Sequence, residues 1–436
     1  MKPAGQTSLQ KASRRLLPIV FAGYIVAYLD RANVAFANLP MSAALGFTPA
    51  VFGFGAGIFF LGYFLLEIPS TLIVQRLGAR SWLTRIVVTW GICSIAMAWV
   101  RSPVQFYVAR FLLGCAEAGF YPGVLVYLSL WFPQEERARA MAKFGIAAPI
   151  ALMAGAPLSA MILDAQWPGF ESWRWLFIIE GLPALIMGAV FWSFLTDRPR
   201  DAKWLNPDER AWLANTLERE ANLGALPAGV PWWRAIARKE VILLAGAAFL
   251  CNVAGYAFVF WLPAVIRSSV PDAAVAKIAV MLPFAGAIVS SLLTARSSDR
   301  TGERKAHAAI PQFVGAVIGL ALLWPSLSGS VVVALFTLLG AAAFSWIPGF
   351  WAIPNLILKG EAAAASIGLI NSIGNLGGFL GPFLIGLLTS RLETRVAAGM
   401  VVAAAYAGAA SLVILVRVPT PVTTSITAKS TGASRD

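Results

Sequence analysis

The sequence contains few charged residues for its length. Only 13% of its 436 residues are Asp, Glu, Lys or Arg, whereas 58% are hydrophobic, and the mean hydropathy is +0.73. An ordinary soluble domain has about a quarter of its residues charged. The composition therefore excludes a water-soluble globular protein and predicts a polytopic helical membrane protein.

Cysteine and histidine are also scarce. Cys93, Cys115 and Cys251 are the three cysteines, an odd number without CxxC or metal-ligand spacing, and His307 is the single histidine. This pattern excludes a disulfide framework and a zinc site, so we expect no metal and no cofactor, and we expect the cysteines to be packing residues. Carboxylates are therefore the groups expected to carry protons.

Long apolar stretches are abundant. Six of them precede a charged segment, and six follow it. A helix needs about 20 apolar residues to cross a hydrocarbon core about 30 Å thick. Spans are predicted near 16–37, 52–74, 82–100, 105–129, 141–163, 174–195, 241–266, 275–295, 308–326, 330–358, 363–389 and 396–417. The sequence therefore predicts an all-α fold of twelve transmembrane helices in two six-helix bundles.

The predicted organisation has five parts. They are an amino-terminal segment (1–15), a first bundle (16–195), a charged linker (196–240), a second bundle (241–417) and a disordered Thr-, Ser- and Ala-rich tail (418–436).

The net charge of +13 indicates membrane topology and argues against nucleic-acid binding. Lys and Arg fall between apolar runs, whereas a phosphate-binding surface would gather them on one soluble face. Most of the 34 basic residues lie at the amino end, in the even-numbered loops and in the tail, which the positive-inside rule places in the cytoplasm. We expect both termini to be cytoplasmic and the protein to lie in the inner membrane.

Two pairs of similar segments indicate an internal duplication. Arg76–Arg80 after the second predicted span matches Arg300–Arg304 after the eighth, and Ala156-Pro157 in the fifth matches Gly381-Pro382 in the eleventh. Both pairs have nearly the same separation in the chain, so duplication explains them better than chance. Parallel halves with a midplane site between them form the architecture of one transporter class.

The loop Asp299-Arg300-Thr301-Gly302-Glu303-Arg304 resembles the signature loop of the major facilitator superfamily. Its first copy departs from the pattern at Gln75, where an acidic residue is usual. The resemblance implies a gating role for these loops, carried by Arg76, Gly78, Arg80, Asp299, Arg300, Gly302 and Arg304.

Four longer motifs resemble the anion:cation symporter family, which carries tartrate, phthalate, hydroxyphenylacetate and sugar acids. The motifs are 28–33 (YLDRAN), 62–70 (GYFLLEIPS), 110–119 (RFLLGCAEAG) and 371–378 (NSIGNLGG). The resemblance implies proton-coupled uptake of a small organic anion by alternating access, with tartrate or a related hydroxy or aromatic carboxylate as cargo and a sugar acid as the alternative. We expect a monomer.

Charged side chains within the predicted spans are the candidate functional groups. A charge at mid-bilayer costs about 2.5–3.5 kcal/mol on insertion scales, so it needs a partner or a wet cavity. The first six spans contain Asp30, Arg31, Glu67, Arg110, Glu117 and Glu180, whereas the second six have no comparable charge away from their ends. We expect the ion chemistry to be concentrated in the first half.

Arg31 and Arg110 are the predicted anion-binding groups, because a guanidinium stays protonated and binds a carboxylate through two parallel hydrogen bonds. Asp30 and Glu117 are the predicted proton-coupling groups, and the family resemblance implies the same division. A buried ion-pair network that only fixes helix packing is the alternative. Glu67 and Glu180 are expected near span ends, with structural or gating roles.

Further substrate contacts are predicted from polar and aromatic residues on both sides of the site. The candidates are Tyr28, Asn33, Tyr63, Tyr256, Trp351, Asn371 and Asn375. Asn371 and Asn375 are four apart and share a helix face. The alternative is that such residues only hold helices together, as amides often do in membrane bundles.

Three other functions remain open from the sequence. A membrane receptor would favour an added soluble output domain, which the chain lacks, and a membrane-embedded enzyme would need a nucleophile–base pair or a metal motif such as HExxH. An exporter of hydrophobic compounds fits two buried arginines less well than an anion carrier does. We therefore expect a transporter that is not an enzyme.

Overall fold

The structure is a computed structural model, in which residues 3–165, 167–224, 237–358 and 360–418 are described. Part of the predicted linker (225–236) and nearly all of the predicted disordered tail (419–436) lie outside the described residues. Within the described ranges, every regular element is a helix.

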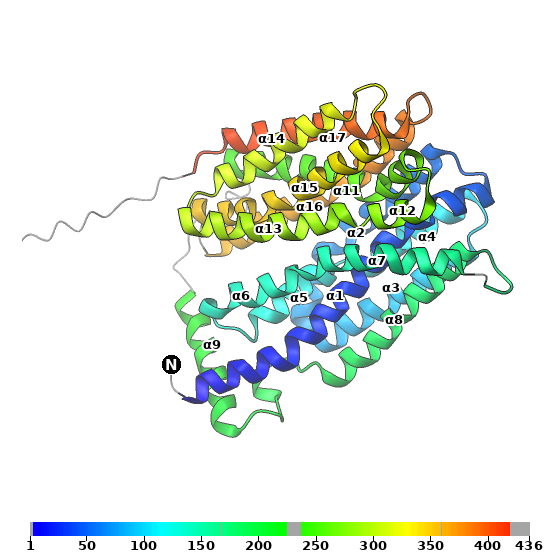
Figure 1. The fold of residues 1–436 in the computed structure, drawn as a ribbon. Helices are drawn as coiled ribbons and strands as arrows, with labels where there is room; N and C mark the ends of the chain where they lie inside the picture. Colours follow the sequence, from blue (N-terminus) through cyan, green and yellow to red (C-terminus); the bar gives the residue numbers. More distant parts are fainter. Residues whose placement is uncertain (1–2, 166, 225–236, 359, 419–436) are drawn as a thin grey trace, which may run out of the picture.

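The first half of the chain forms one group of helices, drawn in blue to green in Figure 1. Its elements are α1 (Pro3–Leu45), α2 (Pro49–Leu77), α3 (Ala79–Ala96), η1 (Met97–Trp99), α4 (Pro103–Glu117), α5 (Phe120–Ser129), α6 (Gln134–Gly145), α7 (Ala147–Asp164) and α8 (Ser172–Phe194). A short turn, η2 (Pro199–Asp201), and the linker helix α9 (Pro207–Gly224) follow.

The second half forms a second group of helices above the first in the same view (Figure 1). Its elements are α11 (Lys239–Ser269), α12 (Ala273–Ala279), α13 (Leu282–Thr301), α14 (Lys305–Ala321), α15 (Gly329–Ile357), α16 (Gly360–Leu388) and α17 (Thr394–Leu415). The division of the chain into six, a gap and six spans therefore corresponds to two groups of helices in space.

Eleven helices of the described chain are long and apolar enough to cross a membrane. The remaining predicted span, near 308–326, forms α14, whose 17 residues are at the lower end of the length needed for a crossing. Together these helices account for the twelve predicted spans.

Three predicted spans contain a short break in the helix, although each still forms one membrane-crossing segment. The span near 105–129 divides into α4 and α5 at Gly119, which has φ +85°, and a Cβ added there would lie 2.2 Å from Oγ of Ser70. The span near 141–163 divides into α6 and α7 at Ile146, and its helix begins earlier, at Gln134. The span near 275–295 divides into α12 and α13 at Val280 and Met281. Apolar content predicts that a segment is buried, but it does not predict a short break.

The first helix is much longer than the predicted span 16–37, because α1 begins at Pro3 and ends at Leu45. Its early turns pack on the linker helix, where a Cβ added at Gly5 would lie 2.5 Å from the ring of Trp212. The ammonium of Lys11 donates to both carboxylate oxygens of Glu209, at 2.9 Å each. These early turns are polar on one side, so hydropathy alone misses them.

The two halves pack tightly against each other at one end of the molecule. We call the end that carries α9 and the start of α1 the linker end, and the other end the loop end (Figure 1). At the loop end, a Cβ added at Gly386 of α16 would lie 2.3 Å from the carbonyl oxygen of Pro49 in α2. Lys277 of α12 and Asp164 of α7 also form an ion pair between the halves there. The structure is therefore closed at its loop end.

We expect Glu209→Gln to weaken the attachment of α9 to α1. The hydrogen-bonded Lys11 ammonium, with the backbone N–H of Asn206, holds the pKa of Glu209 below its ordinary value. A carboxylate whose pKa is lowered by folding stabilises the fold above its unfolded pKa of about 4.3, and this contribution is lost as the pH falls through the folded value. At pH 7 the variant should lose about 0.2–1 kcal/mol of stability, the range for partly exposed ion pairs.

The measurement is unfolding in detergent, followed by intrinsic fluorescence from pH 7 down to pH values below the folded pKa. Glu218→Gln, on the exposed side of the same helix, is the control. An equal loss in both variants, or a loss in Glu209→Gln that persists in acid, would contradict this assignment.

Candidate functional site

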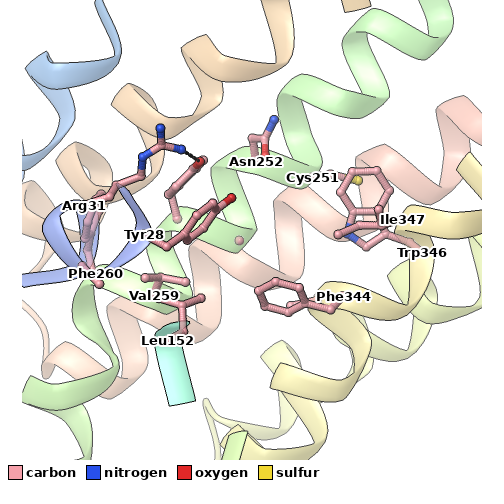
Figure 2. A pocket seen from close by; sticks show the side chains of 14 residues that line it. Tyr28, Arg31, Leu152, Cys251, Asn252, Val259, Phe260, Phe344, Trp346 and Ile347 are labelled. Carbon is pink, nitrogen blue, oxygen red and sulfur yellow. Dashed lines mark hydrogen bonds between the residues drawn. The ribbon is translucent and has the colours of Figure 1, made fainter. Parts of the chain in front are cut away.

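A cavity of about 100 Å³ lies between the two halves of the molecule. Its walls come from α1 and α7 of the first half and from α11 and α15 of the second. Figure 2 shows Arg31 and Tyr28 on one side of it and Phe344, Trp346 and Ile347 on the other. The cavity therefore has a positive charge on one wall and an apolar, aromatic surface on the opposite wall.

Arg31 is the charged group of this cavity, and its guanidinium contacts both halves. Nη2 forms an ion pair with Oε1 of Glu117 in α4. Nη1 donates to the hydroxyl of Tyr256 in α11, at 3.2 Å. The guanidinium carbon also lies 5.2–5.4 Å from the ring centroids of Tyr28, Phe59 and Tyr63, within the range of cation–π attraction.

Asp30 points away from the cavity that Arg31 lines. Consecutive side chains on a helix diverge by about 100°, so the two cannot share a direction. Oδ1 of Asp30 accepts hydrogen bonds from Oγ of Ser94 in α3 and from Nδ2 of Asn33, while Oδ2 has no hydrogen-bond partner. Asn33 is thus a partner of Asp30, and the structure does not place it on the cavity wall.

Arg110 and Glu117 lie on one face of α4, as their spacing of seven requires. Arg110 is fully buried, with Nη2 donating to the carbonyl of Ala56 at 3.3 Å and its guanidinium 4.9 Å from the ring centroid of Phe59. Its Nε and Nη1 have no hydrogen-bond partner, and neither does Oε2 of Glu117. Arg110 does not line the described cavity, so its anion-binding role stays a prediction.

The close approach of α4 to α2 places these charges beside Arg31. Gly114 lies between Arg110 and Glu117, and a Cβ added there would lie 2.0 Å from the carbonyl oxygen of Phe59 in α2. Gly62 of α2 is equally crowded, with the carbonyl oxygen of Phe111 at 2.3 Å from its added Cβ. Glycines at this contact are therefore required by backbone packing.

Asn371 and Asn375, which the sequence predicts as substrate contacts, contact the protein's own carboxylate in this structure. Nδ2 of Asn371 donates to Oε1 of Glu67 at 2.6 Å, and Nδ2 of Asn375 lies 3.4 and 3.3 Å from its two oxygens. Ser372 donates to Oε2 at 3.1 Å. We call these three α16 side chains the amide cradle.

Glu67 and Glu180 lie well inside their helices, which corrects the expectation that they lie near span ends. Glu67 is in α2 with 3% of its surface exposed, and Glu180 is in α8 with 4% exposed. Ser159 of α7 donates to Oε1 of Glu180 at 2.8 Å, and Oε2 has no partner.

The aromatic wall of the cavity comes from α15 residues other than the sequence candidate. Trp351, the sequence candidate, packs against Phe350 with ring centroids 5.4 Å apart and does not line the cavity. Trp346 and Phe344, not singled out from the sequence, do line it. Because α15 contains two tryptophans in one apolar segment, the sequence pattern does not indicate which of them faces the cavity.

Tyr28 and Tyr256 line the cavity, and Tyr63 faces Arg31 from outside its described lining. Asn252 and Cys251 of α11 also line it. Asn252 lies beside the amide cradle, because a Cβ added at Gly374 would be 3.0 Å from its Nδ2.

The two signature loops have different partners. In the second, Arg304 donates from Nη1 to Asp299 at 2.7 Å, whereas Arg300 is exposed and Gly302 adopts φ +69°. In the first, where Arg76 is exposed, the backbone N–H of Arg80 donates to Asp197 at 2.8 Å.

The acidic partner of the first loop therefore comes from the chain after α8. Gly78 adopts φ +90°, and a Cβ added there would lie 2.8 Å from Oδ1 of Asp197. The sequence comparison of the two loops could not find Asp197, because it lies far away in the chain.

The described residues contain no group of three or more His, Cys, Asp or Glu side chains that could hold a metal ion. The polar side chains that line the cavity are the guanidinium of Arg31, the amide of Asn252 and the hydroxyls of Tyr28 and Tyr256.

The sequence model of the Major Facilitator Superfamily matches residues 20–382. The chain belongs to this superfamily. Its fold agrees with that assignment, since the xylose transporter XylE from E. coli, solved in an inward open conformation, superposes with a TM-score of 0.75 at 14% identity, over 94% of this chain and 98% of that one.

Relatives in the superfamily are transporters. A putative tartrate transporter of Agrobacterium vitis is 43% identical over 379 residues, covering 87% of this chain and 84% of its own. A quinolone resistance transporter of Acinetobacter baumannii is 39% identical over 378 residues, covering 86% of each chain. These likenesses are consistent with the anion:cation symporter type of carrier, and this superfamily member is a multi-pass membrane transporter.

We expect Gly114→Ala to destabilise the protein and to displace the charged groups of α4. The added methyl group would meet the backbone of α2, which cannot rotate away as a side chain can. Overpacking of this kind costs about 1–3 kcal/mol. Thermal unfolding in detergent measures the loss, with Gly145→Ala in α6 as the control, because nothing lies within 4 Å of a Cβ added there. Equal unfolding temperatures would contradict this account of the contact.

Proposed function

We propose that this transporter is a proton-coupled importer of a small carboxylate, with tartrate or a related hydroxy or aromatic carboxylate as its cargo. It would lie in the inner membrane with both termini in the cytoplasm, so the linker end would be cytoplasmic. Import would proceed by alternating access, in which the cavity between the halves opens to each side in turn.

The position of Arg31 is the observation that carries this proposal. Its guanidinium lies in the wall of the cavity between the halves, held by Glu117 from the first half and by Tyr256 from the second. A guanidinium presents paired donors that match a carboxylate, so an organic anion entering the cavity would compete with Glu117 for Arg31.

The balance of charge between Arg31, Glu117 and the substrate carboxylate would couple transport to protons. When Glu117 is ionised, it neutralises Arg31, and a second carboxylate would bring uncompensated negative charge into a low-dielectric site, which is costly. Protonation of Glu117 removes that obstacle and frees Arg31 for the substrate. Asp30 has an unpartnered oxygen in the same half and is the second proposed proton site.

The conformation fits one stage of the proposed cycle. The halves are in contact at the loop end, through Lys277 and Asp164 and through the crowded contact of α2 with α16. With the linker end in the cytoplasm, this arrangement would belong to the part of the cycle in which the outer side is closed.

The test is uptake by purified protein in proteoliposomes. Labelled mono- and dicarboxylates, including tartrate, are offered with and without an acid-outside pH gradient. We expect accumulation of a carboxylate only with the gradient, and we expect Asp30→Asn and Glu117→Gln to lose this accumulation. Arg31→Gln should lower uptake at low substrate concentration by about 30-fold or more, because truncating one partner of a buried charge pair at a binding contact costs about 2–5 kcal/mol of binding free energy.

Two exposed positions provide matched controls. Glu218→Gln in α9 and Arg296→Gln in α13 make the same chemical changes away from the cavity, and both should accumulate substrate as the wild type does. Full gradient-driven accumulation by both Asp30→Asn and Glu117→Gln would overturn the proton assignment. Failure of the wild type to accumulate any carboxylate would overturn the proposed function.

A quinolone is the second candidate cargo, because a quinolone resistance transporter is 39% identical to this chain. Quinolone antibiotics are aromatic carboxylic acids, so Arg31 and the aromatic wall of α15 suit them chemically. Uptake and efflux of a labelled quinolone in the same proteoliposomes distinguish the two cargoes.

A further inference from the structure

Glu67 is a buried carboxylate that joins the two halves of the protein. It lies in α2, and its carboxylate oxygens accept hydrogen bonds from three residues of α16: Asn371, Ser372 and Asn375. No Lys or Arg among the described residues forms an ion pair with it. Its negative charge is therefore balanced by neutral donors that belong to the opposite half.

The chemistry of this contact depends on the charge of Glu67. An ionised carboxylate only accepts hydrogen bonds, and here both oxygens face N–H or O–H donors. A protonated carboxyl group has an O–H of its own, which on Oε1 would face only amide N–H donors and on Oε2 would require the Ser372 hydroxyl to turn from donor to acceptor. The amide cradle as it stands is thus arranged for the ionised form, and it must rearrange when Glu67 takes up a proton.

The position of the contact in the interface gives it a mechanical consequence. Starting at the loop end, α2 meets α16 at Pro49 and Gly386, then at Gly53 and Pro382, where an added Cβ would lie 2.5 Å from the proline carbonyl oxygen. Further along, α2 reaches the amide cradle through Glu67. Of these contacts, the one at Glu67 lies nearest the linker end, so it limits how far that end can open.

We propose that Glu67 is a third ionisable group of the transport cycle, whose ionised form ties α2 to the amide cradle of α16 and whose protonation releases that tie. The inference deepens the proposed function and rests on it for the link to transport. It assigns to Glu67 a positioning role between the halves, distinct from the anion-binding role of Arg31.

Other titratable groups face this contact from the surrounding helices. They are Tyr63 one turn earlier on α2, Arg31 on α1, Glu117 on α4 and Tyr256 on α11. The described residues of α16 that contact Glu67 are neutral. Tyr63 lies next to the Arg31 guanidinium, at 5.4 Å from its ring centroid, so it connects the substrate-binding charge to the carboxylate between the halves.

The charge of Glu67 would determine when the inner side opens during the transport cycle. With the linker end in the cytoplasm, an ionised Glu67 holds the inner side closed until a proton arrives with the substrate. Protonation then permits inward opening, and loss of the proton to the cytoplasm restores the tie. An unprotonated carrier would open inward less often, which limits the leak of substrate without protons.

The experiment measures the opening of the linker end directly, without substrate. Spin labels are placed at Leu72 in α2 and Leu356 in α15, which are exposed near this end on opposite halves, after the three cysteines have been replaced by alanine. Distances between the labels are measured in lipid nanodiscs from pH 5 to pH 8. Glu67→Gln, Glu67→Asp and Asn371→Ala are compared with the parent, and Glu393→Gln in an exposed loop is the matched control.

We expect the parent to be closed at pH 8 and to open on acidification. Glu67→Gln, which resembles the protonated form, should be open already at pH 8, whereas Glu67→Asp should recover much of the parent behaviour. Asn371→Ala should shift the opening to higher pH by roughly one unit, because a carboxylate that has lost a donor takes up a proton more readily. The same Asn371→Ala change should have no further effect in the Glu67→Gln background.

A parent-like pH dependence in Glu67→Gln would overturn the proposal, and so would an unshifted profile in Asn371→Ala. If Glu67→Gln does not fold, as judged by size-exclusion chromatography, the Asn371→Ala profile decides the question by itself. A purely structural contact would change thermal stability without changing the pH at which the linker end opens.

A transport measurement separates this proposal from the proposed function. In proteoliposomes, Glu67→Gln should still exchange substrate across the membrane at a rate close to that of the parent, but it should lose gradient-driven accumulation. If the parent itself accumulates no carboxylate, the proposed function fails, while the distances still report whether Glu67 controls the opening.

Discussion

The guanidinium of Arg31 lies among aromatic rings in the interior of the bundle, where an unpaired charge would be very costly. Glu117 pairs with it, and Tyr28, Phe59 and Tyr63 place their rings around it. These side chains pack around the guanidinium and stabilise its charge inside the bundle. Glu117 belongs to α4, which packs closely on α2, and the glycines at that contact make this packing sterically possible.

Charge is distributed unequally between the two halves. The first half contributes the guanidinium and carboxylate groups, whereas the second presents a tyrosine hydroxyl, amides and an aromatic wall. Around the cavity and the amide cradle, polar contacts between the halves therefore join a charged group to a neutral one, as at Arg31 with Tyr256 and at Glu67 with Asn371. Such contacts can be broken and remade without leaving a second buried charge unpaired, which suits halves that move relative to each other.

Several features of the fold were predictable from the sequence, because hydropathy depends on local composition alone. The apolar runs predicted the spans, and the gap predicted the linker. The break at Gly119 and the early start of α1 were not predictable, because they depend on Ser70 and on the linker helix, which are distant in the chain. Arg31, Arg110 and Glu117 were identifiable as candidates for the same reason, because each is a charged residue within an otherwise apolar run.

The sequence by itself determined which charges must be buried and that the chain is a two-half membrane protein of the major facilitator type. The tertiary structure decided the partners: Glu117 and Tyr256 for Arg31, Ser94 for Asp30, and the α16 amides for Glu67. It also decided that Trp346, rather than Trp351, lines the cavity. The physical reason is that burial follows from the composition of one segment, whereas a partner is chosen by how helices from distant parts of the chain cross and rotate against each other.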